Sequence, residues 1–238
     1  MNDALRLIRV DPRQRTGVLV WLGVILGMIL MMVAVGGVTR LTDSGLSITE
    51  WEPILGVIPP RTEEAWQARF DQYRAYPEYQ LLNRGMSLGE FKVIFFWEYL
   101  HRLLGRLVGC FFFRLKVWCL WGWGLSRVVG WVWGGGLVWG GLQGLMGWYM
   151  VQSGLVDVPH VSHFRLAVHL GLAFVLFGYL LWLFLAVGGA GSMGGPGRDV
   201  RGLRWFAAGG RGGVLAVVVV WGGGGGGGGG GVGGPHAA

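Results

Sequence analysis

GVLVWLGVILGMILMMVAVGGVT, residues 17–39, is a stretch without a single charged side chain. A helix needs about 20 apolar residues to span the hydrocarbon core of a bilayer, and this stretch supplies them. No small-residue cleavage site interrupts it early, so it predicts a membrane anchor rather than a signal peptide. The sequence therefore indicates a protein that folds in a membrane.

Three further stretches predict membrane-spanning helices. Residues 128–156 and 166–197 are also uncharged. The stretch from Phe91 to about Phe113 contains ionisable side chains, but two features favour a span. Ser87-Leu88-Gly89-Glu90 has the form of a capping box, and alternating orientation requires one more crossing. The predicted fold class is an all-α integral membrane protein with a bundle of four transmembrane helices.

The composition agrees with this fold class. Of 238 residues, 53% are hydrophobic and 14% are charged, whereas soluble proteins carry about 25% charged residues. The net charge of +7 is not gathered in one basic tract, so we expect it to report membrane orientation and expect no nucleic acid partner. Cys110 and Cys119 match neither a redox nor a zinc spacing, so no structural disulfide is expected.

The basic residues also predict the orientation of the chain. Arginines precede the first span and follow the second and fourth spans, which places those segments and the N-terminus inside. We expect a cytoplasmic segment at 1–16, the bundle at 17–187 with an outer loop at 40–90, and a disordered, low-complexity, Gly-rich tail at 188–238. Aromatic residues favour an ordered outer loop, and Thr62-Glu63-Glu64 predicts the start of a short helix there.

Ionisable residues inside the predicted spans are the candidates for chemistry. The second span holds Glu98, His101, Arg102 and Arg106, and each costs about 2.5 to 3.5 kcal/mol to insert unless it finds a polar partner. His169 lies in the fourth span at a comparable depth. Two imidazoles on facing helices can ligate one metal, and such a pair suits a haem iron better than zinc. The alternative is that each histidine only forms hydrogen bonds between helices.

Arg40 closes the first span and has two interpretations. It snorkels to the membrane interface, or its guanidinium binds a carboxylate such as a porphyrin propionate through two hydrogen bonds. The residues alone therefore indicate a membrane haem protein. A transporter-like bundle, in which Arg40, Glu98 and the histidines line a polar path, is the alternative of another class, and an absence of haem absorption would favour it.

Three long strings resemble a known family. They are GGVTRLTDSGLSITEWEPILGVIPP at 36–60, EFKVIFFWEYLHRLLGRLVG at 90–109 and QGLMGWYMVQSGLVDVPHVSHFRLAVHL at 143–170. The chain resembles haem A synthases of the alphaproteobacterial and mitochondrial type over about residues 17–185. The resemblance implies an oxidoreductase that converts the ring D methyl group of haem O to the formyl group of haem A for terminal cytochrome oxidase.

The resemblance also implies a location and partners. It places the protein in the bacterial inner membrane as a multi-pass protein in contact with membrane lipid. Haem O and haem A are the implied substrate and product. Haem O synthase and an electron donor are the further implied partners, and assembly into a homo-oligomer is compatible with the family.

The resemblance assigns roles to individual residues. Family members are similar to two joined four-helix halves, each with a histidine pair, and His101 and His169 match the amino-terminal pair of axial ligands, where haem O binds. Glu98 matches the residue that handles protons or stabilises positive charge during the oxidation. Arg40, Arg102 and Arg106 are expected to bind propionates or structural carboxylates.

The resemblance ends where the second half of the family would begin. Residues 188–238 offer no replacement haem ligands, so we expect the haem b site, which belongs to the carboxy-terminal half, to be missing from this chain. The alternative function is a non-catalytic membrane protein that binds a b-type haem or transfers electrons. That alternative needs the same two histidines but has no use for Glu98.

Overall fold

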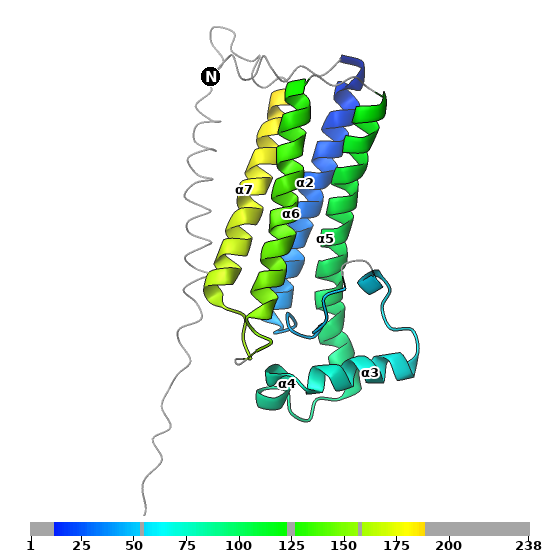
Figure 1. Cartoon of the computed structure of the whole chain (residues 1–238), viewed down its shortest axis with the longest axis vertical. Coiled ribbons are helices and arrows are strands. Elements are labelled where there is room, and N and C mark those ends of the chain that lie inside the picture. The colour runs from blue at the N-terminus through cyan, green and yellow to red at the C-terminus, as the bar shows by residue number, and fades with distance from the viewer. Residues whose placement is uncertain (1–11, 53–54, 123–126, 157–158, 189–238) are drawn as a thin grey trace, which may run out of the picture.

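The computed structural model describes residues 12–52, 55–122, 127–156 and 159–188, and every regular element in these ranges is a helix. Four long helices lie side by side (Figure 1). They are α2 (Pro12–Leu41), α5 (Leu88–Gly122), α6 (Arg127–Gln152) and α7 (His163–Val187). The predicted all-helical class is confirmed for this part of the chain.

The order of packing places two of these helices diagonally opposite each other. Helix α2 packs against both α5 and α7, and α6 packs against the same two helices. Helices α5 and α7 therefore face each other across the middle of the group. Two segments, 15–41 and 163–187, have the length and apolar composition of membrane spans.

Some helix ends differ from the sequence prediction. Helix α5 continues beyond Phe113 to Gly122, because no glycine or proline interrupts residues 111–121. Helix α7 ends at Val187, the residue at which the sequence also placed the end of the bundle, and Gly188 forms its C-cap. Glycine disfavours the interior of a helix. The predicted tail lies outside the described residues except for Gly188.

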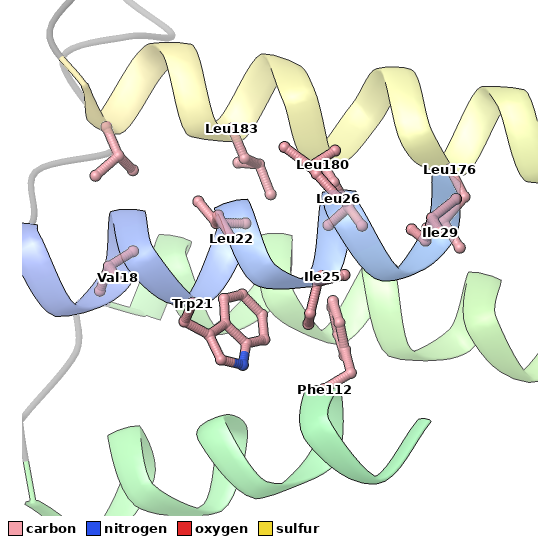
Figure 2. Packing of buried hydrophobic residues seen from close by; sticks show 11 residues of the cluster. Val18, Trp21, Leu22, Ile25, Leu26, Ile29, Phe112, Leu176, Leu180 and Leu183 are labelled. Carbon is pink, nitrogen blue, oxygen red and sulfur yellow. The ribbon is translucent and has the colours of Figure 1, made fainter. Parts of the chain in front are cut away.

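Apolar side chains pack α2 and α7 together at the end that contains the N-terminus of α2 (Figure 2). The cluster repeats every three or four residues along each helix, so it forms one continuous face. Its members are Val18, Trp21, Leu22, Ile25, Leu26, Ile29, Phe112, Leu176, Leu180, Leu183 and Val187. At the same end, Nε of Arg15 donates to the carbonyl of Val187 at 2.9 Å and satisfies one of the free carbonyls of α7.

Short helices in segment 41–87 form a cap over the opposite end of the group (Figure 1). They are η1 (Leu55–Val57), α3 (Glu63–Arg74) and α4 (Pro77–Leu81). The hydroxyl of Thr62 accepts the amide of Ala65 at 3.2 Å, which confirms the predicted start of α3. The predicted capping box is also present, because the Glu90 carboxylate accepts the amide of Ser87 and the Ser87 hydroxyl accepts the amide of Glu90.

Aromatic residues hold the cap on α5. Phe70 and Tyr73 of α3 are buried against Phe91 and Phe95, which lie one turn apart on α5. The ring centroids of Phe70 and Phe91 are 5.0 Å apart, and those of Tyr73 and Phe91 are 5.3 Å apart. These aromatic contacts fix the cap over the face of α5 that continues to Glu98.

Candidate functional site

His101 and His169 come from the two diagonal helices, α5 and α7. Each ring lies against a glycine of a neighbouring helix. A Cβ atom built on Gly36 of α2 would lie 2.9 Å from Cε1 of His101, and a Cβ built on Gly147 of α6 would lie 3.0 Å from Cε1 of His169. Each imidazole therefore occupies a notch that only a glycine leaves open.

The ring nitrogens of the two histidines share one feature. The Nδ1 atoms of both rings are buried without a hydrogen-bond partner among the described residues. A neutral imidazole nitrogen without a hydrogen-bond partner remains available as a metal ligand. The two rings lie within electrostatic reach of each other.

Gln143 was missed by the sequence analysis. Its amide nitrogen donates to the carbonyl of His169 at 2.9 Å, and its Oε1 atom is buried without a partner in the described part of the chain. It lies one helical turn from Gly147 on α6. The signal in the sequence was a polar residue in the middle of a largely apolar span, at a spacing of four from the glycine that contacts His169.

Glu98 lies one turn from His101 on α5 and is 3% exposed. Its Oε2 atom accepts the hydroxyl of Ser47 at 2.7 Å and the amide of Ile48 at 2.8 Å. Its Oε1 atom accepts Nη2 of Arg102 at 2.6 Å and Nε of Arg102 at 3.0 Å. Glu98 is therefore a buried carboxyl group that pairs with Arg102 on its own helix and ties α5 to residues 47–48.

Arg102 and Arg106 attach residues 48–52 to α5. The guanidinium of Arg102 donates to the carbonyls of Ile48 at 2.8 Å and Glu50 at 3.2 Å. Nη2 of Arg106 donates to the carbonyl of Glu52 at 2.8 Å. These contacts give both arginines a structural task that the sequence analysis did not foresee, because their partners are backbone carbonyls about 50 residues away.

Two other arginines lie one turn closer to the cap than the histidine pair. Arg40 follows Gly36 by one turn on α2, is 37% exposed, and pairs with Asp43 at 3.1 Å. Arg165 precedes His169 by one turn on α7. Its guanidinium lies 3.8 Å from the centre of the Tyr149 ring and donates to the Tyr149 carbonyl at 2.9 Å. The sequence analysis selected Arg40 and missed Arg165, although its spacing of four from His169 was visible.

Comparisons with known proteins agree with this geometry. Residues 19–225 match the COX15-CtaA family, described as cytochrome oxidase assembly protein. The chain is 54% identical over 171 residues to a protein of Rhodospirillum centenum, an alignment that covers 71% of this chain and 46% of that protein. It is 48% identical over 188 residues to a protein of Nitrosospira multiformis, with coverage of 79% and 53%. Both relatives bear the name Heme A synthase.

A third relative, from Dinoroseobacter shibae, has the same name and is 50% identical over 190 residues, with coverage of 75% of this chain and 48% of the relative. No solved structure matches the chain. The chain spans about half the length of the curated relatives it matches. The family match covers most of the chain and includes both histidines with their glycine partners. The chain therefore belongs to the COX15-CtaA family of cytochrome oxidase assembly proteins, which are membrane proteins.

Proposed function

We propose that this chain binds haem O and acts in its conversion to haem A, the oxidation of the ring D methyl group to a formyl group that supplies terminal cytochrome oxidase. The observation that carries the proposal is the diagonal pair of His101 and His169, each seated on a glycine and each with one ring nitrogen left over. The names of the relatives support the choice of haem among possible ligands.

The proposed roles follow from the positions of the residues. His101 and His169 would hold the iron of haem O through their imidazole nitrogens. Iron in a bound haem supplies the redox chemistry, while the side chains of this chain hold and orient the macrocycle. We assign no residue of this chain to haem b, the cofactor proposed for a second four-helix half. Haem O synthase and an electron donor are proposed partners.

We further propose that all four long helices cross the bacterial inner membrane, with the N-terminus in the cytoplasm and the cap outside. The apolar residues exposed on the outer faces of the helices would then contact lipid. Examples are Leu30, Met31, Phe111, Val138 and Val175. Arginines beside the cytoplasmic ends and the polar cap at the other end support this orientation.

Glu98 is proposed to accept a proton or to balance positive charge as the methyl group is oxidised. Its support is its burial and its place one turn from His101, toward the cap. Because Arg102, Ser47 and Ile48 hold both of its oxygens, the carboxylate is preorganised and needs no rearrangement to act as a fixed negative charge.

The test of this function is the haem content of a host that makes haem O but no haem A. Expression of the chain there is expected to yield haem A, identified by chromatography of extracted haems. The Glu98→Gln variant should retain bound haem and yield no haem A. Haem A in equal amount from that variant would contradict the proposed role of Glu98.

A non-catalytic haem-binding or electron-transfer protein is the second candidate. One observation favours it, namely that every hydrogen bond of Glu98 goes to a structural partner. This candidate is supported if the purified chain shows a reversible haem spectrum while haem O remains unconverted in the same cells.

Arg40 and Arg165 are proposed to bind the two propionates of the haem, since each lies one turn toward the cap from the histidine pair. Arg40→Gln is expected to weaken haem binding about tenfold or more, because a charge-assisted hydrogen bond contributes about 1.5 to 3 kcal/mol. Titration of the protein with haem measures this change. Arg61→Gln, at an exposed position of the cap, is the control. Equal haem affinities of Arg40→Gln and Arg61→Gln would mean that Arg40 lies at the membrane interface and does not bind the haem.

The glycine notches give a sharper prediction. Gly36→Ala and Gly147→Ala are expected to displace the imidazoles and to reduce the haem bound per protein severalfold, because the new Cβ would lie about 3 Å from each ring. Gly27→Ala on α2 and Gly144→Ala on α6 are the matched controls, since a Cβ there meets nothing within 4 Å. These controls should bind haem fully and be slightly more stable, as alanine favours a helix. A normal haem content in Gly36→Ala would contradict the prediction that His101 needs a glycine at position 36.

A further inference from the structure

A second buried carboxyl group lies in the cap, and the proposed function leaves it without a role. Glu78 in α4 is 3% exposed, and its Oε2 atom has no hydrogen-bond partner among the described residues. No lysine or arginine forms an ion pair with it in the same part of the chain. A buried carboxylate without a cation is costly, so this site favours the neutral acid.

Two carboxylates near Glu78 act in the same direction as its burial. The charges that reach its carboxyl group are those of Glu98 on α5 and Asp43 after α2, whereas the neighbouring Tyr73 phenol of α3 lowers the pKa of Glu78. Burial raises the pKa of Glu78 to about 8, and the two nearby carboxylates add to that rise. Burial also raises the pKa of the Tyr73 phenol, so the phenol keeps its proton.

Glu78 and Glu98 therefore form a pair of carboxyl groups in contrasting surroundings. Glu98 has an arginine, a hydroxyl and a backbone amide as hydrogen-bond partners, whereas Glu78 has no cation beside it and its Oε2 atom has no hydrogen-bond partner among the described residues. The charge of Glu98 stabilises the proton on Glu78 through like-charge repulsion. Two neighbouring carboxyl groups in such contrasting surroundings commonly take different roles, one as an acid and the other as a base.

Two polar side chains, Tyr73 and Asn83, lie between Glu78 and the surface of the cap. The amide nitrogen of Asn83 donates to the phenol oxygen of Tyr73 at 2.7 Å. Asn83 in turn lines an open groove of about 600 Å3 that also includes Thr42, Arg84 and Glu90. Tyr73 thus lies between the buried carboxyl group and a residue that borders the groove.

The geometry points to Glu78 as a proton-holding residue of the cap that is coupled to Glu98, and this inference rests on the proposed function. When Glu98 gains a proton from the haem side, its negative charge is lost. The repulsion that favoured the protonated form of Glu78 is then lost as well. The O–H bond of Glu78 then breaks, and the proton leaves past Tyr73 to water in the groove. One proton arrives and one departs, so the charge of the pair is unchanged and no electron is transferred. Glu78 acts through Glu98 and is a positioning residue.

Infrared titration of the purified full chain tests the inference without any need for activity. We expect a carbonyl band of a protonated carboxyl group that disappears as the pH rises through about 8. Glu78→Gln should remove this band, and Glu98→Gln should move its midpoint to lower pH, because the repelling charge is gone. Asp71→Asn, at an exposed position of α3, is the control and should leave the band unchanged.

Thermal unfolding provides a second measurement of the same group. The pKa of Glu78 is raised in the folded state from the ordinary value of 4.5, so the unfolded chain releases this proton at lower pH. Its contribution to stability is complete below about pH 4.5 and is lost as the pH rises to about 8. Glu78→Gln, which keeps a neutral side chain of similar shape, should flatten that loss and fold normally at neutral pH.

Three results separate the possible failures. A carbonyl band that survives in Glu78→Gln would overturn the assignment of the neutral acid. A band that titrates identically with Gln at position 98 would overturn the coupling. A band with both expected responses in a protein that makes no haem A would support the proton-holding pair and refute the proposed function alone.

Discussion

Replacement of His101 or His169 by alanine is expected to remove the haem from this protein. Each variant would leave the iron with one of its two proposed protein ligands. We expect the haem retained per protein to fall by more than about tenfold in either variant. Even the substitution of a residue that is hydrogen-bonded to a metal ligand lowers metal affinity by about 10- to 100-fold.

The reduced-minus-oxidised absorption spectrum of each purified variant measures this effect. His160→Ala is the matched control, because His160 is exposed between α6 and α7 and should leave the spectrum unchanged. If either histidine variant kept the full low-spin spectrum, the pair would not be the axial ligand set. If the wild-type protein bound no haem at all, a polar path of the transporter type would become the better interpretation.

Loss of Glu98 is expected to have the largest effect on stability. Glu98→Ala removes the partner of Arg102 and leaves the Ser47 hydroxyl and the Ile48 amide without their acceptor. Removal of one member of a buried ion pair costs about 3 to 5 kcal/mol. The midpoint of thermal unfolding in detergent should therefore fall markedly, and the cap should become sensitive to proteases.

A second substitution separates structure from chemistry at this position. Glu98→Gln keeps one carbonyl oxygen for Ser47 and Ile48 and loses the charge, so we expect a smaller loss of stability together with loss of haem A formation. Glu63→Gln tests an exposed ion pair, that with Lys92, and should change stability by less than about 1 kcal/mol. Equal unfolding midpoints for Glu98→Ala and Glu63→Gln would contradict the structural role of Glu98.

Local features of the chain were predictable from the sequence. The capping box at Ser87 and Glu90 and the N-cap at Thr62 both depend on residues three positions apart, and both are present. The pairing of Glu98 with Arg102 depends on a spacing of four and is also present. The end of α5 was predicted less accurately, because charge marks the limit of a span while glycine and proline mark the limit of a helix.

Partners distant in sequence could not be predicted. Arg102 and Arg106 bind backbone carbonyls of segment 48–52, and every residue offers such a carbonyl, so no residue type identifies it. The contacts of the histidine rings with Gly36 and Gly147 depend on which helices are neighbours. Glycines are abundant in this chain, so composition did not single these two out.

By itself, the sequence predicted that this protein is helical, that it contains segments apolar enough for a membrane, and that two histidines lie in two of its long apolar segments. Hydropathy, capping and helical spacing are local properties, and a single chain segment contains them in full. Only the tertiary structure decided that α5 and α7 are diagonal, that glycines contact both imidazoles, and that Glu98 is paired with an arginine while Glu78 is not. The state of a buried charge depends on the groups that surround it in space, and those groups come from distant parts of the chain.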